Sequence, residues 1–264
     1  MKTVLTIAGS DCSGGAGIQA DIKTITAHGL YAMSAITALT AQNTTGVFGV
    51  LEAGEEFVAK QLDCIFTDIF PDAVKIGMVS SAPMIRAIAR KLRQYGARHV
   101  VLDPVMVSTS GSKLLEDTAI EALTGELFPC ADLITPNIPE AQVLSGRKIV
   151  HAQDMERAAQ DLSARYHVAV LVKGGHLVET ANDYLFCGGE GTWLRAQRAE
   201  NENTHGTGCT LSSAIACGLA QGLCMEDAVR HAKQFLLGAL STGLNLGKGS
   251  GPLNHCFAIG KPQW

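Results

Sequence analysis

A glycine-rich segment in the C-terminal part of the chain has the residue types that suit phosphate binding. Gly206, Thr207 and Gly208 precede Cys209, and a stretch typical of a helix follows them. Glycines let backbone N–H groups approach an anion closely, and a helix N-terminus adds a partial positive charge. The segment therefore predicts a cradle for a transferring phosphoryl group. An ordinary glycine-rich turn before a helix is the competing interpretation.

Cys209 would lie in the first turn of that helix, where the helix terminus favours a thiolate. It is a candidate acceptor for the proton of an attacking hydroxyl group, or a residue of the pocket wall. The alternative is a buried and unreactive cysteine. The chain has eight cysteines and no Cys-x-x-Cys pair, so most of them are expected to be buried small hydrophobic residues in a reducing compartment.

Charged residues follow three of the short apolar runs. Asp103 and Glu140 are candidate magnesium ligands, because magnesium phosphate sites use one or two carboxylates together with substrate oxygens. Lys173 is a candidate cation for phosphate. Each has a simpler explanation, since Asn137 and Glu140 have the spacing of a helix capping box and a strand-end lysine can extend to solvent. Their common placement after successive strands favours a site.

The first glycine-rich segment, residues 9–17, follows an apolar run and precedes a helix. It is not a Walker A loop, because Gly15 stands where that motif requires lysine. A relaxed dinucleotide fingerprint ends at Ala20, but residues 33–50 contain no acid to bind a ribose. Asp21 lies one turn into this helix. Its carboxylate either faces a ligand cleft beside the glycine-rich segment or is exposed to solvent.

The elements that must position these residues alternate between short apolar runs and amphipathic stretches. Continuous apolar strands separated by helices predict a parallel sheet covered on both faces. Expected strands are residues 4–8, 73–76, 99–102, 133–134 and 168–172, and expected helices are 18–28, 55–69, 82–95, 208–221 and 225–241.

Residues 183–187 and 192–198 flank a glycine-rich turn at 188–191 and predict an antiparallel hairpin. We therefore expect one three-layer α/β/α domain over residues 1–264, with a mostly parallel sheet and an antiparallel edge hairpin. In such sheets ligands bind beyond the carboxyl ends of the strands.

Composition excludes several classes of partner. The net charge is −4 and aromatic residues make up 5% of the chain, so neither a basic patch nor a stacking surface for nucleic acid is expected. No apolar run approaches the roughly 20 residues that span a bilayer. We expect no membrane contact and a cytoplasmic location.

Two motifs carry a family resemblance. Residues 13–21 (SGGAGIQAD) and 203–210 (NTHGTGCT) are specific together, and residues 38–44 and 75–78 add support. On these motifs the chain resembles the hydroxymethylpyrimidine/phosphomethylpyrimidine kinases of thiamine synthesis, which belong to the ribokinase-like superfamily. The resemblance extends over nearly the whole chain.

The resemblance implies phosphorylation of 4-amino-5-hydroxymethyl-2-methylpyrimidine to its monophosphate and then its diphosphate, with ATP and Mg²⁺, by an enzyme that is usually a homodimer. It also implies roles for particular residues. The pyrimidine would contact Gly9, Asp21, Gln42, Met78 and Val105; the anion hole would comprise Gly206, Thr207, Gly208 and Cys209; Asp103 and Glu140 would serve Mg²⁺, and Lys173 and Asn137 the nucleotide phosphates.

Three other functions compete. Pyridoxal kinases share the fold and some share a cysteine at the position of Cys209, so pyridoxal phosphorylation or dual activity is an alternative; Gln42 favours the pyrimidine. A nucleotide-binding oxidoreductase would fit the early glycines but lacks the ribose-binding acid. A ligand sensor would not need Asp103, Glu140, Lys173 and Cys209 together.

Overall fold

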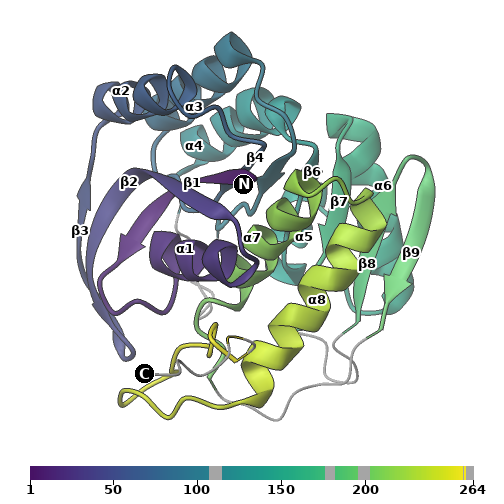
Figure 1. Ribbon diagram of the computed structural model, residues 1–264. Helices are drawn as coiled ribbons and strands as arrows, with labels where there is room; N and C mark the ends of the chain where they lie inside the picture. Colours follow the sequence, from purple (N-terminus) through teal and green to yellow (C-terminus); the bar gives the residue numbers. More distant parts are fainter. Residues whose placement is uncertain (107–114, 176–181, 196–202, 258, 260–264) are drawn as a thin grey trace.

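A single sheet organises the computed structural model, which describes residues 1–106, 115–175, 182–195, 203–257 and 259. Among these residues nine strands are hydrogen-bonded in the order β3-β2-β1-β4-β5-β6-β7-β8-β9 (Figure 1). The strands are β1 (Thr3–Asp11), β2 (Tyr31–Asn43), β3 (Gly46–Glu52), β4 (Ala73–Ile76), β5 (Val100–Leu102), β6 (Leu133–Ile134), β7 (Ala169–Val172), β8 (Asp183–Cys187) and β9 (Glu190–Leu194).

The centre of the sheet is parallel and both of its edges are antiparallel. β1 pairs in parallel with β2 and β4, and the parallel pairing continues through β5 and β6 to β7. β8 and β9 form the predicted antiparallel hairpin, and β3 adds a second antiparallel edge beside β2. The parallel sheet and its hairpin are therefore confirmed.

Helices cover both faces of the sheet. They are α1 (Gly17–Ala27), α2 (Glu55–Phe66), α3 (Ala82–Tyr95), α4 (Asp117–Ala122), α5 (Ile138–Ser145), α6 (Ala152–Tyr166), α7 (Thr207–Ala220) and α8 (Met225–Ser241), with a π-helical turn (Leu123–Leu127) and a 3₁₀ turn (Phe128–Cys130) after α4.

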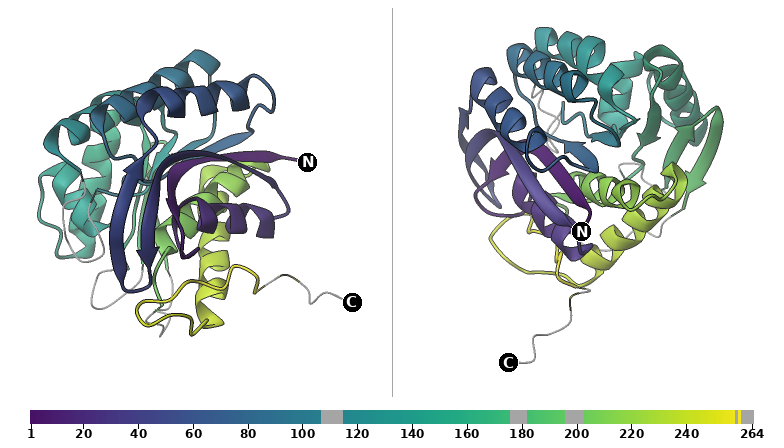
Figure 2. Two further views of the ribbon diagram at one scale, coloured as in Figure 1. Left: turned by 90° about the vertical axis from the view of Figure 1, so that its left-hand side faces the viewer. Right: turned by 45° about the horizontal axis from the view of Figure 1, so that its top comes forward.

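A hydrophobic core lies between the sheet and the helices on each of its two faces. Leu5 and Ile7 of β1 pack with residues of α2 to α6 on one face, whereas Val4 packs with α1, α7 and α8 on the other. Successive strand side chains point to opposite faces, which explains the division. Figure 2 shows the sheet between the two layers of helices, so the predicted three-layer architecture is confirmed.

Several predicted bounds change for local reasons. β9 begins at Glu190 because Gly188 and Gly189, with φ of 62° and 87°, form a two-residue turn. The predicted end of that strand, residues 196–198, lies outside the described residues. β5 begins one residue late because His99 has a φ of 54°. None of the described helices combines the length and apolarity needed to cross a bilayer.

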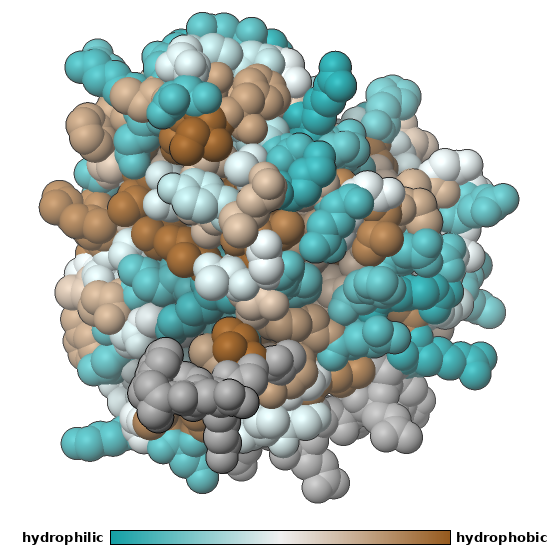
Figure 3. All heavy atoms as spheres, viewed as in Figure 1, coloured by the Kyte–Doolittle hydropathy of each residue, from teal (hydrophilic) through white to brown (hydrophobic). Residues whose placement is uncertain are grey.

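The β2–β3 edge was not predicted, and it carries exposed apolar side chains. Figure 3 shows hydrophobic surface gathered on the left of the molecule, where β2 and β3 lie in Figure 1. Six large apolar residues of these strands are at least half exposed: Tyr31, Leu39, Val47, Phe48, Val50 and Leu51. Contiguous exposed apolar surface on an edge strand is typical of a protein interface.

Candidate active site

The glycine-rich segment lies at the start of α7, as predicted. Gly206 is the N-cap residue and has a φ of 86°, a conformation that favours glycine. A Cβ atom on Gly206 would overlap the carbonyl oxygen of Gly15. The two glycine-rich segments of the chain therefore pack backbone against backbone, and any side chain at Gly206 would separate them.

The first turn of α7 faces an ion pair from two strand ends. Nζ of Lys173, after β7, lies 2.7 Å from Oδ1 of Asp103, after β5. A Cβ atom on Gly208 would lie 2.9 Å from Oδ2 of Asp103 and 3.4 Å from Nζ of Lys173. The absence of a side chain at Gly208 thus lets the N-terminus of α7 lie directly against a carboxylate and an ammonium group. A helix N-terminus beside these two charges suits the binding of a phosphoryl group with a bound cation.

Lys173 is a permanent cation in this site. Burial alone would lower its pKa, but the carboxylates of Asp103 and Glu140 outweigh burial and raise the pKa above its usual value. Thr135 donates a hydrogen bond of 3.2 Å to Oδ1 of Asp103, the same oxygen that binds Lys173. Oδ2 of Asp103 is left directed toward the first turn of α7.

Glu140 caps α5 and also holds a neighbouring loop. Its Oε2 accepts the N–H of Asn137 and its own N–H donates to Oδ1 of Asn137, each at 2.9 Å, so the capping-box interpretation is confirmed. Oε1 accepts the N–H of Met106 at 3.0 Å. Burial and the Asp103 carboxylate raise the pKa of Glu140, although the ammonium group of Lys173 opposes them.

The donor set fits a magnesium ion that arrives with a nucleotide. Among the described residues no group of three or more His, Cys, Asp or Glu side chains could hold a metal. Asp103 and Glu140 are the buried carboxylates beside Lys173, and magnesium usually combines one or two carboxylates with phosphate oxygens and water. The magnesium roles of Asp103 and Glu140 stay predictions.

Glu140→Gln is expected to raise the magnesium concentration needed for half-maximal activity, because one carboxylate charge is lost. It should also weaken the α5 cap, since an amide cannot accept both backbone N–H groups equally. Asp154→Asn is the matched control, because Asp154 forms the corresponding capping contacts at α6 on the protein surface. Magnesium titrations of both variants measure the effect; identical titrations would leave Glu140 with the capping role alone.

Cys209 is the third residue of α7 and is only partly exposed. Burial raises the pKa of its thiol, although the Lys75 ammonium group and the N–H of Gly17 reduce the effect. The predicted bias toward thiolate is therefore wrong. The sequence shows the helix terminus but not the depth at which the sulfur lies.

Asp21 is fully buried against Lys75, a residue that sequence reasoning did not assign to the site. The Lys75 ammonium group lies 2.8 Å from Oδ2 and 2.9 Å from Oδ1 of Asp21. Thr6 and Ser213 donate further hydrogen bonds of 2.6 and 2.7 Å to the carboxylate. Burial opposes the charge on Lys75, but Asp21 raises its pKa above the usual value. The only sequence signal was a lysine inside an otherwise apolar strand.

Asp11 shapes the first glycine-rich segment and joins it to α7. Its carboxylate accepts the backbone N–H groups of Ser13, Gly15 and Ala16. Nε2 of His205, directly before Gly206, lies 2.9 Å from Oδ2 of Asp11. Although burial opposes it, these hydrogen bonds hold the pKa of Asp11 well below its usual range. Neither side chain was predicted from the sequence to belong to the site.

The predicted pyrimidine-binding residues lie at the ends of neighbouring strands. A Cβ atom on Gly9 would lie 3.4 Å from Sδ of Met78, so these two residues are adjacent. Gln42, near the end of β2, contacts His205. Val105 has a φ of 46°, which is strained for a β-branched residue and typical of a functional site. Substrate contacts of these residues and of Asp21 stay predictions.

The C-terminal segment braces the start of α7. Pro252 forms a parallel bridge with His205, and Oγ1 of Thr210 lies 2.8 Å from Nε2 of His255. Burial, with a smaller contribution from Lys23, lowers the pKa of His255 to about 4, so the imidazole is neutral at physiological pH. Thr210 follows Cys209, so this contact fixes the helix turn that faces Asp103 and Lys173.

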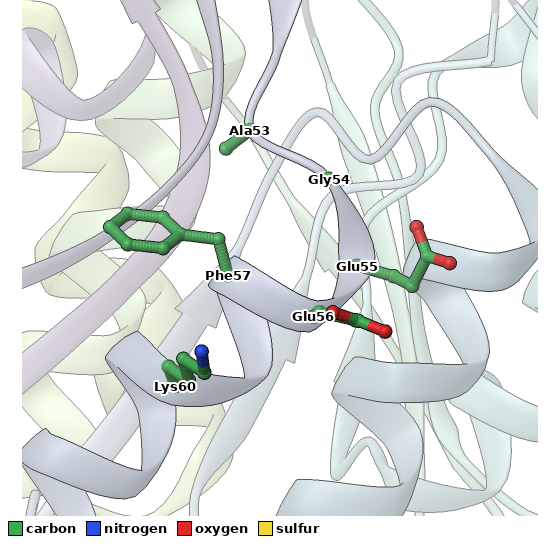
Figure 4. A pocket seen from close by; sticks show the side chains of 6 residues that line it. All are labelled: Ala53, Gly54, Glu55, Glu56, Phe57 and Lys60. Carbon is green, nitrogen blue, oxygen red and sulfur yellow. The ribbon is translucent and has the colours of Figure 1, made fainter.

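A hollow of about 390 Å³ lies elsewhere, at the start of α2. Figure 4 shows that its lining residues belong to the β3–α2 connection and the first turns of α2: Ala53, Gly54, Glu55, Glu56, Phe57 and Lys60. It contains none of the predicted site residues. We place the active site at the strand ends because the buried charges and the two glycine-rich segments meet there.

Comparisons with known proteins identify the family to which the chain is similar. The family model described as phosphomethylpyrimidine kinase matches residues 11–254. The hydroxymethylpyrimidine/phosphomethylpyrimidine kinase of Rhizobium meliloti is 51% identical over 255 residues, covering 95% of this chain and 96% of the relative. The thiamine biosynthesis bifunctional protein ThiED of Geobacter sulfurreducens is 49% identical over 97% of this chain, which spans about half (52%) of that longer relative.

Solved structures show the same fold. The phosphomethylpyrimidine kinase of Clostridium difficile 630 matches with a TM-score of 0.82 and 46% identity, over 89% of this chain and 98% of that one. An ADP complex of Bacillus subtilis pyridoxal kinase matches with a TM-score of 0.91 and 35% identity, over 97% and 98%. These matches confirm the ribokinase-like fold class.

Proposed function

This chain belongs to the phosphomethylpyrimidine kinase family, and we propose that it transfers the γ-phosphoryl group of ATP to 4-amino-5-hydroxymethyl-2-methylpyrimidine. A second transfer would convert the monophosphate to the diphosphate. Both products belong to thiamine biosynthesis, the process named for the Geobacter relative. A cytoplasmic location is part of the proposal.

One observation carries the proposal: the first turn of α7 lies directly against the Asp103–Lys173 ion pair at Gly208. Phosphoryl transfer depends mainly on positioning and on neutralising charge, with little covalent chemistry for the protein to perform. Backbone N–H groups, a helix dipole and a permanent ammonium group supply that neutralisation here.

In the first transfer, the hydroxymethyl oxygen forms a bond to the γ-phosphorus while the bond from that phosphorus to the β–γ bridging oxygen breaks. ADP leaves, and the hydroxyl proton is released to solvent. The N–H groups at the start of α7 and the Lys173 ammonium group would bind the oxygens of the moving phosphoryl group. Magnesium, held by Asp103 and Glu140, would offset the remaining phosphate charge.

The raised pKa of Cys209 favours a role in the pocket wall. A protonated thiol cannot accept the hydroxyl proton, and a loose transition state needs little early deprotonation. The second transfer needs no base at all, because a phosphate oxygen of the monophosphate is the nucleophile. One site without a strong base is therefore compatible with both steps.

Cys209→Ala is expected to lower turnover by less than the ~10²–10⁴-fold typical of losing a general base, with unchanged ATP affinity. Cys217→Ala is the control, since Cys217 is buried on the same helix away from its first turn. Steady-state kinetics and ATP titration measure both effects. A loss of turnover within or above that range, with unchanged ATP affinity, would indicate that Cys209 is the general base. An unchanged turnover would indicate that Cys209 only lines the pocket.

A coupled ADP-release assay tests the proposed function. Hydroxymethylpyrimidine, its monophosphate and pyridoxal are compared side by side at saturating magnesium and ATP. We expect the first two to support ADP release with a higher kcat/KM than pyridoxal. ADP release with pyridoxal alone would overturn the pyrimidine assignment.

Pyridoxal phosphorylation is the second candidate, because the Bacillus pyridoxal kinase structure matches over nearly the whole chain. Gln42 argues for the pyrimidine, since an amide offers a donor and an acceptor side by side and an aminopyrimidine presents the complementary pair. Dual activity would appear in the same assay as comparable kcat/KM values.

The homodimer implied by the family resemblance has a candidate interface at the β2–β3 edge. The exposed apolar residues of this edge, Leu39, Val47, Phe48, Val50 and Leu51, would be covered by the same surface of a second copy. A twofold axis makes such a surface self-complementary, as most homodimers require.

Phe48→Asp combined with Leu51→Asp is expected to convert the dimer to a monomer, because two charges would be buried at the centre of the interface. Val143→Asp is the control, since Val143 is an exposed apolar residue on α5. Light scattering coupled to size exclusion gives the masses. A wild-type monomer, or a double variant that stays dimeric, would contradict the assignment of this edge.

A further inference from the structure

We propose that His205 is a positioning residue that fixes the orientation of the Gln42 amide and thereby sets the preference for an aminopyrimidine. The inference rests on the proposed function, in which Gln42 contacts the substrate ring. It is carried by three side chains that meet at the ends of β1 and β2 and before α7: Asp11, Gln42 and His205.

Asp11 determines which atom of His205 carries a proton. Its Oδ2 already accepts the N–H groups of Gly15 at 3.1 Å and Ala16 at 2.9 Å, and its Oδ1 accepts two hydrogen bonds from Ser13. A proton on Oδ2 would point toward these N–H groups and be repelled by them. Asp11 is therefore an ionised carboxylate, which only accepts hydrogen bonds. Nε2 of His205, 2.9 Å away, must therefore be an N–H donor.

The same Nε2 lies 3.2 Å from the terminal atom of the Gln42 amide that the structure places as Nε2. With the amide nitrogen on that side, two N–H donors would face each other. With Oε1 on that side, the His205 N–H donates to Asp11 and Gln42 together. The partners of an amide decide between its two orientations, and here they place Oε1 toward His205.

Thr40 selects the same orientation independently. Its hydroxyl group lies 2.8 Å from the carbonyl oxygen of Ser10, which can only accept, so the single hydroxyl proton is used there. The other end of the Gln42 amide, placed as Oε1, lies 3.2 Å from Oγ1 of Thr40. Because the hydroxyl proton is used on Ser10, Oγ1 can only accept from that end of the amide. That end must be the NH₂ group.

The fixed amide keeps one N–H and one lone pair for a ligand. An aminopyrimidine presents the matching pair, an amino group that donates and an adjacent ring nitrogen that accepts. Pyridoxal has no donor and acceptor on neighbouring atoms of this kind. If the amide could rotate freely, half of its orientations would oppose the aminopyrimidine, so His205 selects for that ring through Gln42.

The first experiment needs no substrate. Long-range ¹H–¹⁵N spectra of the imidazole groups, assigned with His205→Gln, are expected to show His205 protonated at Nε2 at neutral pH. An unprotonated Nε2 would overturn the inference, because His205 could not then donate to Gln42.

The second experiment is a double-mutant cycle read by calorimetric binding without ATP. The ligands are hydroxymethylpyrimidine and the same ring without its 4-amino group. His205→Leu is expected to reduce the ratio of the two affinities by up to about twofold, because the amide could then adopt both of its orientations. His205→Gln should retain the ratio, because its NH₂ group can donate to both partners. In a Gln42→Ala background, His205→Leu should leave the ratio unchanged.

The outcomes separate the two levels of the account. A wild-type protein that does not prefer the aminopyrimidine would overturn the proposed substrate and this inference with it. A wild-type preference that His205→Leu leaves intact, or that falls equally with and without Gln42, would overturn only the positioning role. Folding of His205→Leu is protected because Asp11 retains its four hydrogen bonds from Ser13, Gly15 and Ala16.

Discussion

Asp21→Ala is expected to lower the free energy of unfolding by about 3–5 kcal/mol, the usual effect of removing one partner from a buried ion pair. Lys75 and Asp21 are both fully buried, and four hydrogen bonds from three side chains converge on the carboxylate. Without it the Lys75 ammonium group would stay in the core uncompensated, or the lysine would have to lose its proton.

Urea unfolding measures the change in the free energy of unfolding, and two further variants provide the comparison. Asp21→Leu combined with Lys75→Met removes both charges and should recover most of the stability, because apolar replacements of buried pairs are often neutral. Glu126→Ala breaks an exposed pair with Arg86 and should change stability by about 1 kcal/mol or less. An Asp21→Ala protein as stable as the Glu126 variant would contradict the account of this buried pair.

Gly208→Ala is expected to reduce kcat by about 10²–10³-fold, an effect as large as the loss of one anion-hole donor, because the added methyl group would disturb the charges that face the helix N-terminus. The added Cβ would lie 2.9 Å from Oδ2 of Asp103 and 3.4 Å from Nζ of Lys173, so it would displace the carboxylate and separate the ion pair from the start of α7. Alanine is a better helix former than glycine, so the helix itself should not be weakened.

Gly125→Ala is the matched control, because a Cβ atom there would meet nothing within 4 Å. Kinetics with ATP and hydroxymethylpyrimidine, together with thermal unfolding, should show lost turnover at intact stability for Gly208→Ala and neither change for Gly125→Ala. Unchanged turnover of Gly208→Ala would show that the phosphoryl group does not bind at the start of α7.

Much of the fold could be predicted because its parallel strands are continuous apolar runs. The sequence indicates strands at residues 73–76 and 133–134 because both faces of these strands are buried in the sheet. β2 and β3 could not be read in this way. β2 is rich in alanine and threonine with alternating burial, and the apolar residues of β3 are interrupted by Gly49 and lie exposed at the edge of the sheet.

Some contacts of the candidate site could likewise be predicted from the sequence, and others could not. Asp103 and Lys173 follow apolar strands, and parallel strands end at one edge of a sheet, so their proximity was predictable. The contact between Asp11 and His205 joins residues 194 positions apart, and Lys75 reaches Asp21 across 54. Only the packed fold shows such pairs. Burial, which spacing does not show, also reversed the expected pKa shift of Cys209.

Product identification by ³¹P NMR tests the central claim most directly. Wild-type protein is incubated with hydroxymethylpyrimidine, magnesium and excess ATP while spectra are recorded over time. The account predicts a phosphomonoester signal that rises first, followed by the two coupled signals of a diphosphate ester as the monoester declines. ADP and inorganic phosphate without any new ester would contradict it, because the site would then transfer phosphate to water and not to the pyrimidine.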